Sequence, residues 1–152
     1  MGIVAQNRKA RYEYEILQEY EAGIVLVGTE IKSLKQGRAN IQEGYISIDK
    51  SDEAWAYNLN IPPYNQSSKY LNHDPTRKRK LLLTKKEINK LLGSVKEKGL
   101  TIIPLVLYIN DKGYAKIKIA LAKGKKLYDK RESIKKKDIE REVRYLAKKG
   151  KV

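Results

Sequence analysis

The sequence contains no cysteine and no phenylalanine, and it has only one histidine and one tryptophan. Without cysteine the chain forms neither a disulfide framework nor a thiolate metal site, which fits a reducing compartment. Its longest apolar run, residues 101–109, is far shorter than the roughly 20 residues that a bilayer-spanning helix needs. The first ten residues also lack the apolar stretch of a secretory signal. We therefore expect a soluble, cytoplasmic protein with no membrane partner.

Basic residues far outnumber acidic ones. The chain has 33 Lys and Arg against 18 Asp and Glu, a formal net charge of +15. Residues 123–152 hold 13 of these cations and five of the acids, so about half of the excess lies in the last fifth of the chain. Such an excess indicates polyanionic partners and not a particular fold. We expect a compact body over residues 1–122 followed by a basic tail over residues 123–152.

Alternating apolar and polar residues predict a β-rich body. A period of two predicts strands at residues 12–16, 45–48, 54–59 and 114–121, and short apolar runs predict two more at residues 24–27 and 101–109, six in all. Gly23 is interpreted as a break between the first two strands. Residues 44–60 and 101–121 each have the form of a hairpin. We expect an α+β fold, a small OB-like antiparallel β-barrel of about six strands with two or three helices.

Two segments carry helical signals. Ile31 and Leu34 are three residues apart with Gly37 just beyond, which predicts a short helix over residues 30–36. Thr84 and Glu87 form a capping box, and apolar residues recur after it at helical spacing up to a stop at Gly99. The helices are expected to cover the open ends of the barrel. Residues 64–80 predict a long functional or mobile loop.

The tail has few apolar residues. Ile139, Val143 and Leu146 share a helical spacing, but so narrow a stripe buries too little surface to hold a helix alone in water. We expect the tail to be disordered when free and to become helical on a partner.

The chain offers little for catalysis. His73, the only histidine, is followed by Asp74, and a general base of this kind also needs a nucleophile or a metal in suitable geometry. There is no cysteine, no second histidine and no glycine-rich phosphate loop. We interpret His73 as a loop residue that hydrogen-bonds in a turn or to a phosphate. We expect no enzymatic activity, no catalytic residue, no cofactor and no metal.

Several basic clusters predict nucleic-acid binding instead. Cations gather at residues 7–9, 35–38, 77–80, 123–126 and 129–131. A single run of this kind is often only a solvated surface, whereas five runs in a chain of this net charge favour RNA or DNA. Tyrosines in loops or the tail are candidates for stacking on bases, and these are Tyr64, Tyr70 and Tyr128.

Several ordered blocks resemble the small protein B (SmpB) family, whose members are SsrA-binding proteins. The blocks are residues 7–10, 21–24, 28–34, 37–40, 74–83, 122–126 and 129–131, and the resemblance covers roughly residues 6–145. It implies an OB-like barrel that binds the tRNA-like domain of transfer-messenger RNA. It also implies delivery of that RNA, charged with alanine and carried by elongation factor Tu, to a stalled ribosome. The basic tail would enter the vacant decoding centre and message channel and become helical there.

The resemblance also implies which residues act. The RNA-facing surface would comprise Asn7, Arg8, Glu21, Lys35, Arg38, Arg77, Arg79, Lys123, Lys125 and Lys126. The ribosome-binding tail would comprise Tyr128, Asp129, Lys130, Arg131, Lys135, Lys136 and Lys137. Two positions depart from the family pattern, because Lys35 stands where Arg is common and Tyr128 stands where some members have His. We expect a monomer whose contact with elongation factor Tu is indirect, through the charged RNA.

Two other functions remain open from the residues alone. A structural ribosomal protein with a basic tail has the same composition, and it would stay on purified ribosomes at high salt. An RNA-processing enzyme that uses His73 and Asp74 would show turnover that His73→Ala abolishes.

Overall fold

The computed structural model describes residues 2–65, 72–98 and 100–125, with the side chains of residues 97 and 98 outside the description. Short strands dominate this part of the chain, joined by one long and two short helices. The strands are β1 Ile3–Gln6, β2 Tyr14–Ile24, β3 Tyr45–Ile48, β4 Ala54–Tyr57, β5 Arg79–Leu82, β6 Thr101–Ile109 and β7 Ala115–Gly124. The helices are α1 Ala10–Glu13, α2 Gly28–Lys35 and α3 Lys85–Lys98.

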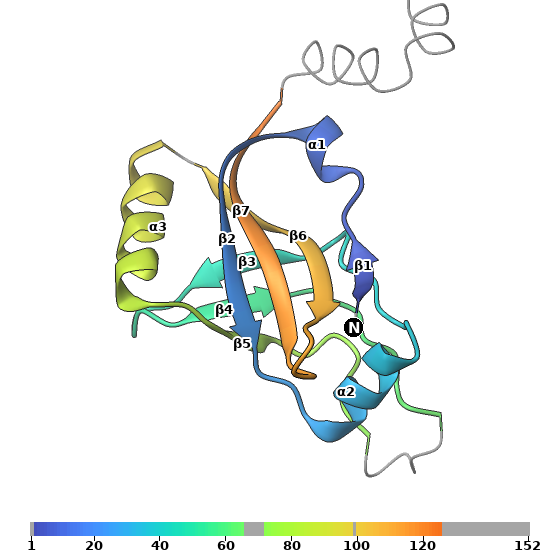
Figure 1. Cartoon of the computed structure of the whole chain (residues 1–152). Coiled ribbons are helices and arrows are strands. Elements are labelled where there is room, and N and C mark those ends of the chain that lie inside the picture. Colours follow the sequence, from blue (N-terminus) through green and yellow to red (C-terminus); the bar gives the residue numbers. More distant parts are fainter. Residues whose placement is uncertain (1, 66–71, 99, 126–152) are drawn as a thin grey trace, which may run out of the picture.

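The strands form one antiparallel sheet that closes on itself. Its order is β1-β6-β3-β4-β5-β2-β7, and an additional pairing of β6 with β7 joins the two sides into a ring. The ring therefore has six strands, and the seventh, β1, pairs only with residues 106–108 of β6 and is not part of the ring. Figure 1 shows the layer of β2, β7 and β6 crossing in front of the layer of β3, β4 and β5. This arrangement confirms the predicted small, OB-like antiparallel barrel.

Period-two side chains fill the ring. In β7 Ala115, Ile117, Ile119 and Leu121 are buried, as the alternation predicts, while Lys118 faces outward. The two larger helices each add an apolar residue to the same core, Leu34 from α2 and Leu91 from α3. In Figure 1 these helices lie on different sides of the sheet. Because both anchoring leucines are almost fully buried, the helices are held as rigid parts of the barrel.

A second, smaller core holds α1 on the outer face of the sheet. Ala10 of α1 packs with Ile103 and Leu105 of β6 and with Ala120 and Ala122 of β7. The small alanines of β7 leave room for the helix, so the outer face is apolar there and basic at Lys118. The end of β7 is tied to the same helix, because the Lys125 backbone N–H donates to the Glu13 carbonyl at 2.9 Å.

Both helix signals in the sequence are confirmed. The Thr84 backbone N–H donates to the Glu87 carboxylate at 3.0 Å, and the Glu87 N–H donates to the Thr84 hydroxyl at 3.2 Å. Gly37 adopts φ of +74° just after α2, a conformation that glycine takes without strain, and its N–H donates to the Leu34 carbonyl. No helix in the described ranges has both the length and the apolar character needed to cross a bilayer.

The prediction of separate strands around Gly23 is wrong. Strand β2 runs through this residue, which pairs with Leu82 on one side and Lys116 on the other. The Leu82 side chain lies over the glycine, and a Cβ there would meet its Cδ1 at 3.4 Å. Tyr12, predicted in a strand, lies in α1, and the segment predicted as a loop to residue 80 already enters β5 at Arg79.

Candidate nucleic-acid interface

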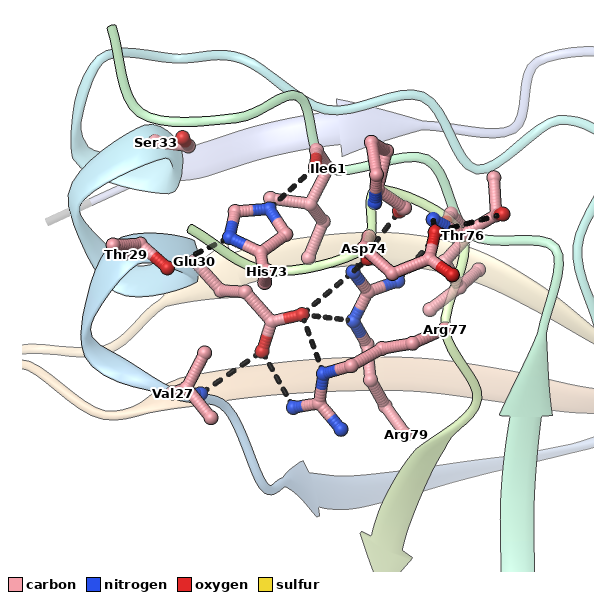
Figure 2. Close-up of polar contacts among 12 residues, drawn as sticks. Val27, Thr29, Glu30, Ser33, Ile61, His73, Asp74, Thr76, Arg77 and Arg79 are labelled. Carbon is pink, nitrogen blue, oxygen red and sulfur yellow. Dashed lines mark hydrogen bonds and ion pairs between the residues drawn. The ribbon is translucent and has the colours of Figure 1, made fainter. Parts of the chain in front are cut away.

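A buried carboxylate joins α2 to the segment before β5. Glu30 is fully buried and accepts a hydrogen bond from the Val27 N–H at 2.9 Å, so it closes the start of its own helix. It also accepts from Arg77 Nε at 3.0 Å, from Arg77 Nη2 at 2.6 Å and from Arg79 Nε at 2.6 Å. Figure 2 shows both guanidinium groups converging on this one carboxylate.

Burial and ion pairing act on Glu30 in opposite directions. Burial alone raises the pKa of this carboxyl, but the hydrogen bonds from Arg77, Val27 and Arg79 outweigh it and hold the pKa below its ordinary value. Burial also disfavours the charged form of Arg79 and so lowers its pKa, and the charge of Glu30 opposes that shift. Because an arginine stays protonated in proteins, the cluster carries two cations and one anion.

Arg79 has no contact with solvent, which corrects its predicted place on the RNA-facing surface. Its side chain is 0% exposed. Besides Glu30, its guanidinium donates to the carbonyls of Leu59 at 2.7 Å and Pro75 at 3.0 Å. Strand β5 alternates, so Arg79 points inward where its neighbours in the basic run point outward. Arg79 therefore holds the segment around residue 75 against α2.

Arg77 combines a buried partner with an accessible side. Its side chain is 32% exposed while its bidentate partner Glu30 is buried. A planar guanidinium held in this way has a fixed direction and little freedom to lose when it meets a phosphate. At the other end of α2, Lys35 is exposed and Arg38 donates to the Pro63 carbonyl at 3.1 Å. Arg77 thus contacts the first turn of α2 through Glu30, and the predicted contacts Lys35 and Arg38 lie at and just after its last residue.

His73 is a structural residue of this region. Its Nε2 lies 2.7 Å from the Ile61 carbonyl and its Nδ1 lies 2.8 Å from the Thr29 hydroxyl (Figure 2). Because a carbonyl only accepts, Nε2 carries the proton and donates it. Both ring nitrogens are therefore engaged, Nδ1 with Thr29 of α2 and Nε2 with Ile61, which confirms the interpretation of His73 as a hydrogen-bonding loop residue.

A second group of predicted residues lies on the outer face, where α1 crosses the sheet. A hollow of about 540 Å³ opens there between β1, α1, β2, β6 and β7, and it is lined by Gln6, Asn7, Arg8, Arg11, Tyr12, Glu19, Leu105, Val106 and Lys118. Asn7 is fixed, because its backbone N–H donates to the Leu105 carbonyl at 2.8 Å and its side-chain amide to the Pro104 carbonyl at 3.0 Å. Arg8 beside it is exposed.

The hollow contains functional candidates that sequence reasoning missed. Arg11 lies in it, paired at 3.3 Å with Glu19, and Lys118 adds a cation from β7. Tyr12 contributes an aromatic wall. The alternation of β7 predicts that Lys118 points outward, away from the buried residues of its strand. It does not predict which residues of other elements lie beside Lys118.

The remaining predicted contacts lie around this face. The Tyr108 hydroxyl donates to the Glu21 carboxylate, so that carboxylate is held in place on the outer side of β2. Burial, with Glu21 as a further cause, raises the pKa of Tyr108 to about 12. Lys123 is exposed in β7, which runs two residues beyond the predicted end of the barrel at residue 122. Lys125 donates through Nζ to the Arg11 carbonyl at 2.9 Å.

The structure thus separates the predicted RNA-facing residues into two surfaces. Asn7, Arg8, Glu21, Lys123 and Lys125 belong to the outer face of β2, β7 and α1. Lys35, Arg38 and Arg77 belong to α2 and its surroundings. Predicted residues outside the described part of the chain are Tyr70, Lys126, Tyr128, Asp129, Lys130, Arg131, Lys135, Lys136 and Lys137.

Comparison with known proteins gives one consistent family. A family model described as SmpB protein matches residues 4–149. An SsrA-binding protein of Wolbachia pipientis wMel is 52% identical over 148 residues, 97% of this chain and 98% of the relative. One from Anaplasma marginale (strain Florida) is 56% identical over 142 residues, covering 93% of this chain and 94% of the relative.

A solved structure agrees with these sequence matches. A chain of "tmRNA-SmpB: a journey to the center of the bacterial ribosome" is 48% identical in sequence and superposes with a TM-score of 0.67. The match covers 91% of this chain and 95% of the solved one. The family model and these relatives each span nearly the whole sequence, so the chain belongs to the SmpB family.

Proposed function

We propose that this chain binds the tRNA-like domain of transfer-messenger RNA and delivers that RNA to stalled ribosomes for rescue and peptide tagging. The observation that carries the proposal is the identity of 52–56%, over nearly the full length, to SsrA-binding proteins. The structural neighbour described as tmRNA-SmpB in the bacterial ribosome supports both halves of it. The protein acts as a binding factor and catalyses no step of its own.

Transfer-messenger RNA meets the outer face around the hollow. Arg8, Arg11 and Lys118 supply positive charge over a rigid sheet, and folded RNA is read largely through phosphates and 2′-hydroxyls. Glu21, held by Tyr108, accepts hydrogen bonds from base amino groups, which gives this face a contact that a uniformly basic surface lacks. Lys123 extends the basic face along β7.

The surface around α2 makes the other contacts of the barrel. Arg77 binds phosphate with a guanidinium already oriented by Glu30, and Lys35, the last residue of α2, and Arg38 just after it add charge at the other end of the helix. Lys35 binds as a point charge where a relative with Arg presents a planar fork.

The tail beyond residue 125 acts on the ribosome. Its cations and the stripe of Ile139, Val143 and Leu146 support a segment that is disordered when free and becomes a helix in the vacant decoding centre and message channel. A protected helix over residues 134–148 of the free protein, measured by hydrogen exchange, would contradict this part of the proposal. The factor works in the cytoplasm as a monomer and meets elongation factor Tu only through the charged RNA.

The test is binding of the purified full chain to transfer-messenger RNA and to bulk tRNA across a salt series. The logarithm of the binding constant should fall with the logarithm of salt by about 0.7–0.9 per phosphate contacted. A large preference for transfer-messenger RNA at physiological salt is the expected result. Equal binding of both RNAs would overturn the proposal.

Two variants locate the contacts. Arg8→Gln/Lys123→Gln should reduce both affinity and salt slope, whereas Lys50→Gln/Lys112→Gln removes the same charge from two exposed turns and should change neither. A truncation after Lys125 removes the tail and keeps β7 and its bond to Glu13 intact. That truncated chain should still bind transfer-messenger RNA and should fail to act on stalled ribosomes.

A further inference from the structure

The solvent-exposed side of α3 is basic along most of its length. Lys85, Lys86, Lys90 and Lys96 are all exposed, and at 1.5 Å per residue they extend over about 16 Å of helix. The apolar residues of α3, among them the buried Leu91, occupy the opposite side. We call these four lysines, together with Gly93, the α3 stripe.

Nothing in the described part of the chain neutralises these lysines. From residue 85 to residue 96 the only acidic residue is Glu87, whose carboxylate is taken by the Thr84 backbone and hydroxyl in the helix cap. The ion pairs found among the described residues involve none of the four lysines. Among the described side chains, the stripe therefore presents positive charge without an ion-pair partner.

Three of the four lysines, Lys85, Lys86 and Lys90, are poorly placed for the stability of the helix itself. Lys85 and Lys86 lie in the first turn, where the helix dipole disfavours cations. Lys86 and Lys90 are four residues apart, so two like charges face each other along the helix, and such pairs are destabilising. An exposed helix selected only for stability would carry acids in its first turn, at residues 85 and 86.

Gly93 is a third unfavourable choice on the same side. It lies in the interior of α3, where glycine is less stable than alanine because it loses more conformational freedom on folding. Packing does not require it, since an added Cβ would find no atom within 4 Å. Because it has no side chain, a glycine on this exposed face lets a ligand approach the helix backbone closely, which suits a binding surface.

We propose that the α3 stripe is a separate binding site for the phosphate backbone of a folded RNA. Lysines bind phosphates as point charges without reading bases, which suits a contact with RNA shape. Figure 1 shows α3 on the opposite side of the sheet from β1 and away from α1, so the stripe is distinct from the outer-face hollow. The inference rests on the proposed function and deepens it by adding a third RNA-binding surface to the same barrel, beside the outer face and the surface around α2.

The full-length variant Lys86→Gln/Lys90→Gln tests the stripe, with Lys50→Gln/Lys112→Gln as a control of equal charge. Two RNA sources are titrated separately across a salt series, namely the tRNA-like domain of transfer-messenger RNA and ribosomes stalled without a message. Losing two phosphate contacts should reduce the salt slope by about 1.4–1.8 on whichever RNA meets the stripe. The thermal stability of the stripe variant should be equal to or above that of the unmodified protein.

Gly93→Ala is an independent variant, because it leaves the charge unchanged. It should raise the melting temperature and weaken binding to the same RNA that the lysine variant loses. A reduced slope on the tRNA-like domain assigns the stripe to transfer-messenger RNA, and a reduced slope on the ribosome assigns it to ribosomal RNA. If neither binding differs from that of the control, the stripe is a solvated surface and the inference is wrong. Failure of the unmodified chain to prefer transfer-messenger RNA refutes the proposed function alone, since the ribosome titration still decides the stripe.

Discussion

Replacing Glu30 with Gln should destabilise the barrel far more than an ordinary surface substitution. The carboxylate accepts four hydrogen bonds, two from Arg77 and one each from Arg79 and the Val27 N–H. Its removal leaves the guanidinium of Arg79, which is 0% exposed, without a counter-charge. Breaking a buried ion pair on one side costs about 3–5 kcal/mol, and the amide of Gln recovers part of this by accepting some of the bonds. We expect a loss of about 2–4 kcal/mol in the free energy of unfolding.

Urea denaturation at neutral pH measures this loss, with Glu43→Gln as the control because that carboxylate is exposed. The double variant Glu30→Gln/Arg79→Met removes the unpaired cation, so it should recover stability relative to Glu30→Gln. If Glu30→Gln cost no more than Glu43→Gln, the buried cluster would not hold α2 to the segment before β5.

The same cluster fixes a pH dependence. The pKa of Glu30 is below its ordinary value of 4.5, so the folded state binds the proton less tightly than the unfolded state does. Its contribution is therefore complete above about pH 4.5 and is lost as pH falls through the lower, folded pKa. Unfolding measured from pH 7 to pH 3 should show stability falling at the acid end, and Glu30→Gln should flatten that fall. An unchanged slope in the variant would show that other carboxyls produce the acid dependence.

Three further predictions concern single positions. Thr84→Ala removes the hydroxyl that accepts a first-turn N–H of α3, so urea denaturation should show a loss of about 1 kcal/mol in the free energy of unfolding. An unchanged free energy of unfolding would show that this cap does not stabilise the protein. Gly44→Ala places a Cβ 2.5 Å from Leu59 Cδ2, so it should cost about 1–3 kcal/mol by the same measurement, and a neutral result would show that the core yields easily. Glu21→Gln should lower the pKa of Tyr108 from about 12, followed by NMR of the ring carbon, and an unshifted value would leave burial as the sole cause.

Much of the ring could be predicted because its hairpins are local. Strands β6 and β7 are joined by a five-residue connection, residues 110–114, that contains the turn signal Asn110–Gly113; β6 is a nearly continuous apolar run, and β7 begins with alternating apolar and lysine residues. The helix at residues 85–98 carried a capping box and a helical apolar period. Such signals are complete within one stretch of sequence, so no knowledge of distant residues is needed to find them.

The missed elements depend on distant partners. Strand β1 has four residues, of which only Ala5 is buried, and it exists because it pairs with residues 106–108 of β6. Strand β5 looks like a basic run because two of its four residues are cations, and its pairing with β2 and β4 makes it a strand. Gly23 follows the same rule, since its backbone pairs on both sides whatever its side chain.

The basic run at residues 77–80 shows why a candidate site cannot be predicted from charge alone. In β5 successive side chains point to opposite faces, so Arg79 enters the barrel while Lys80 pairs outside with Glu53 at 2.7 Å. Lys78 lies over the ring of Trp55, 4.5 Å from its centroid, and Arg77 is fixed by Glu30. The four adjacent cations thus have three side-chain partners, because Arg77 and Arg79 share Glu30, and Arg77 alone combines a bidentate bond to that buried carboxylate with a partly exposed side chain. Arg79, which the charge pattern alone places on the surface, is buried and joins Glu30 of α2 to the Pro75 carbonyl.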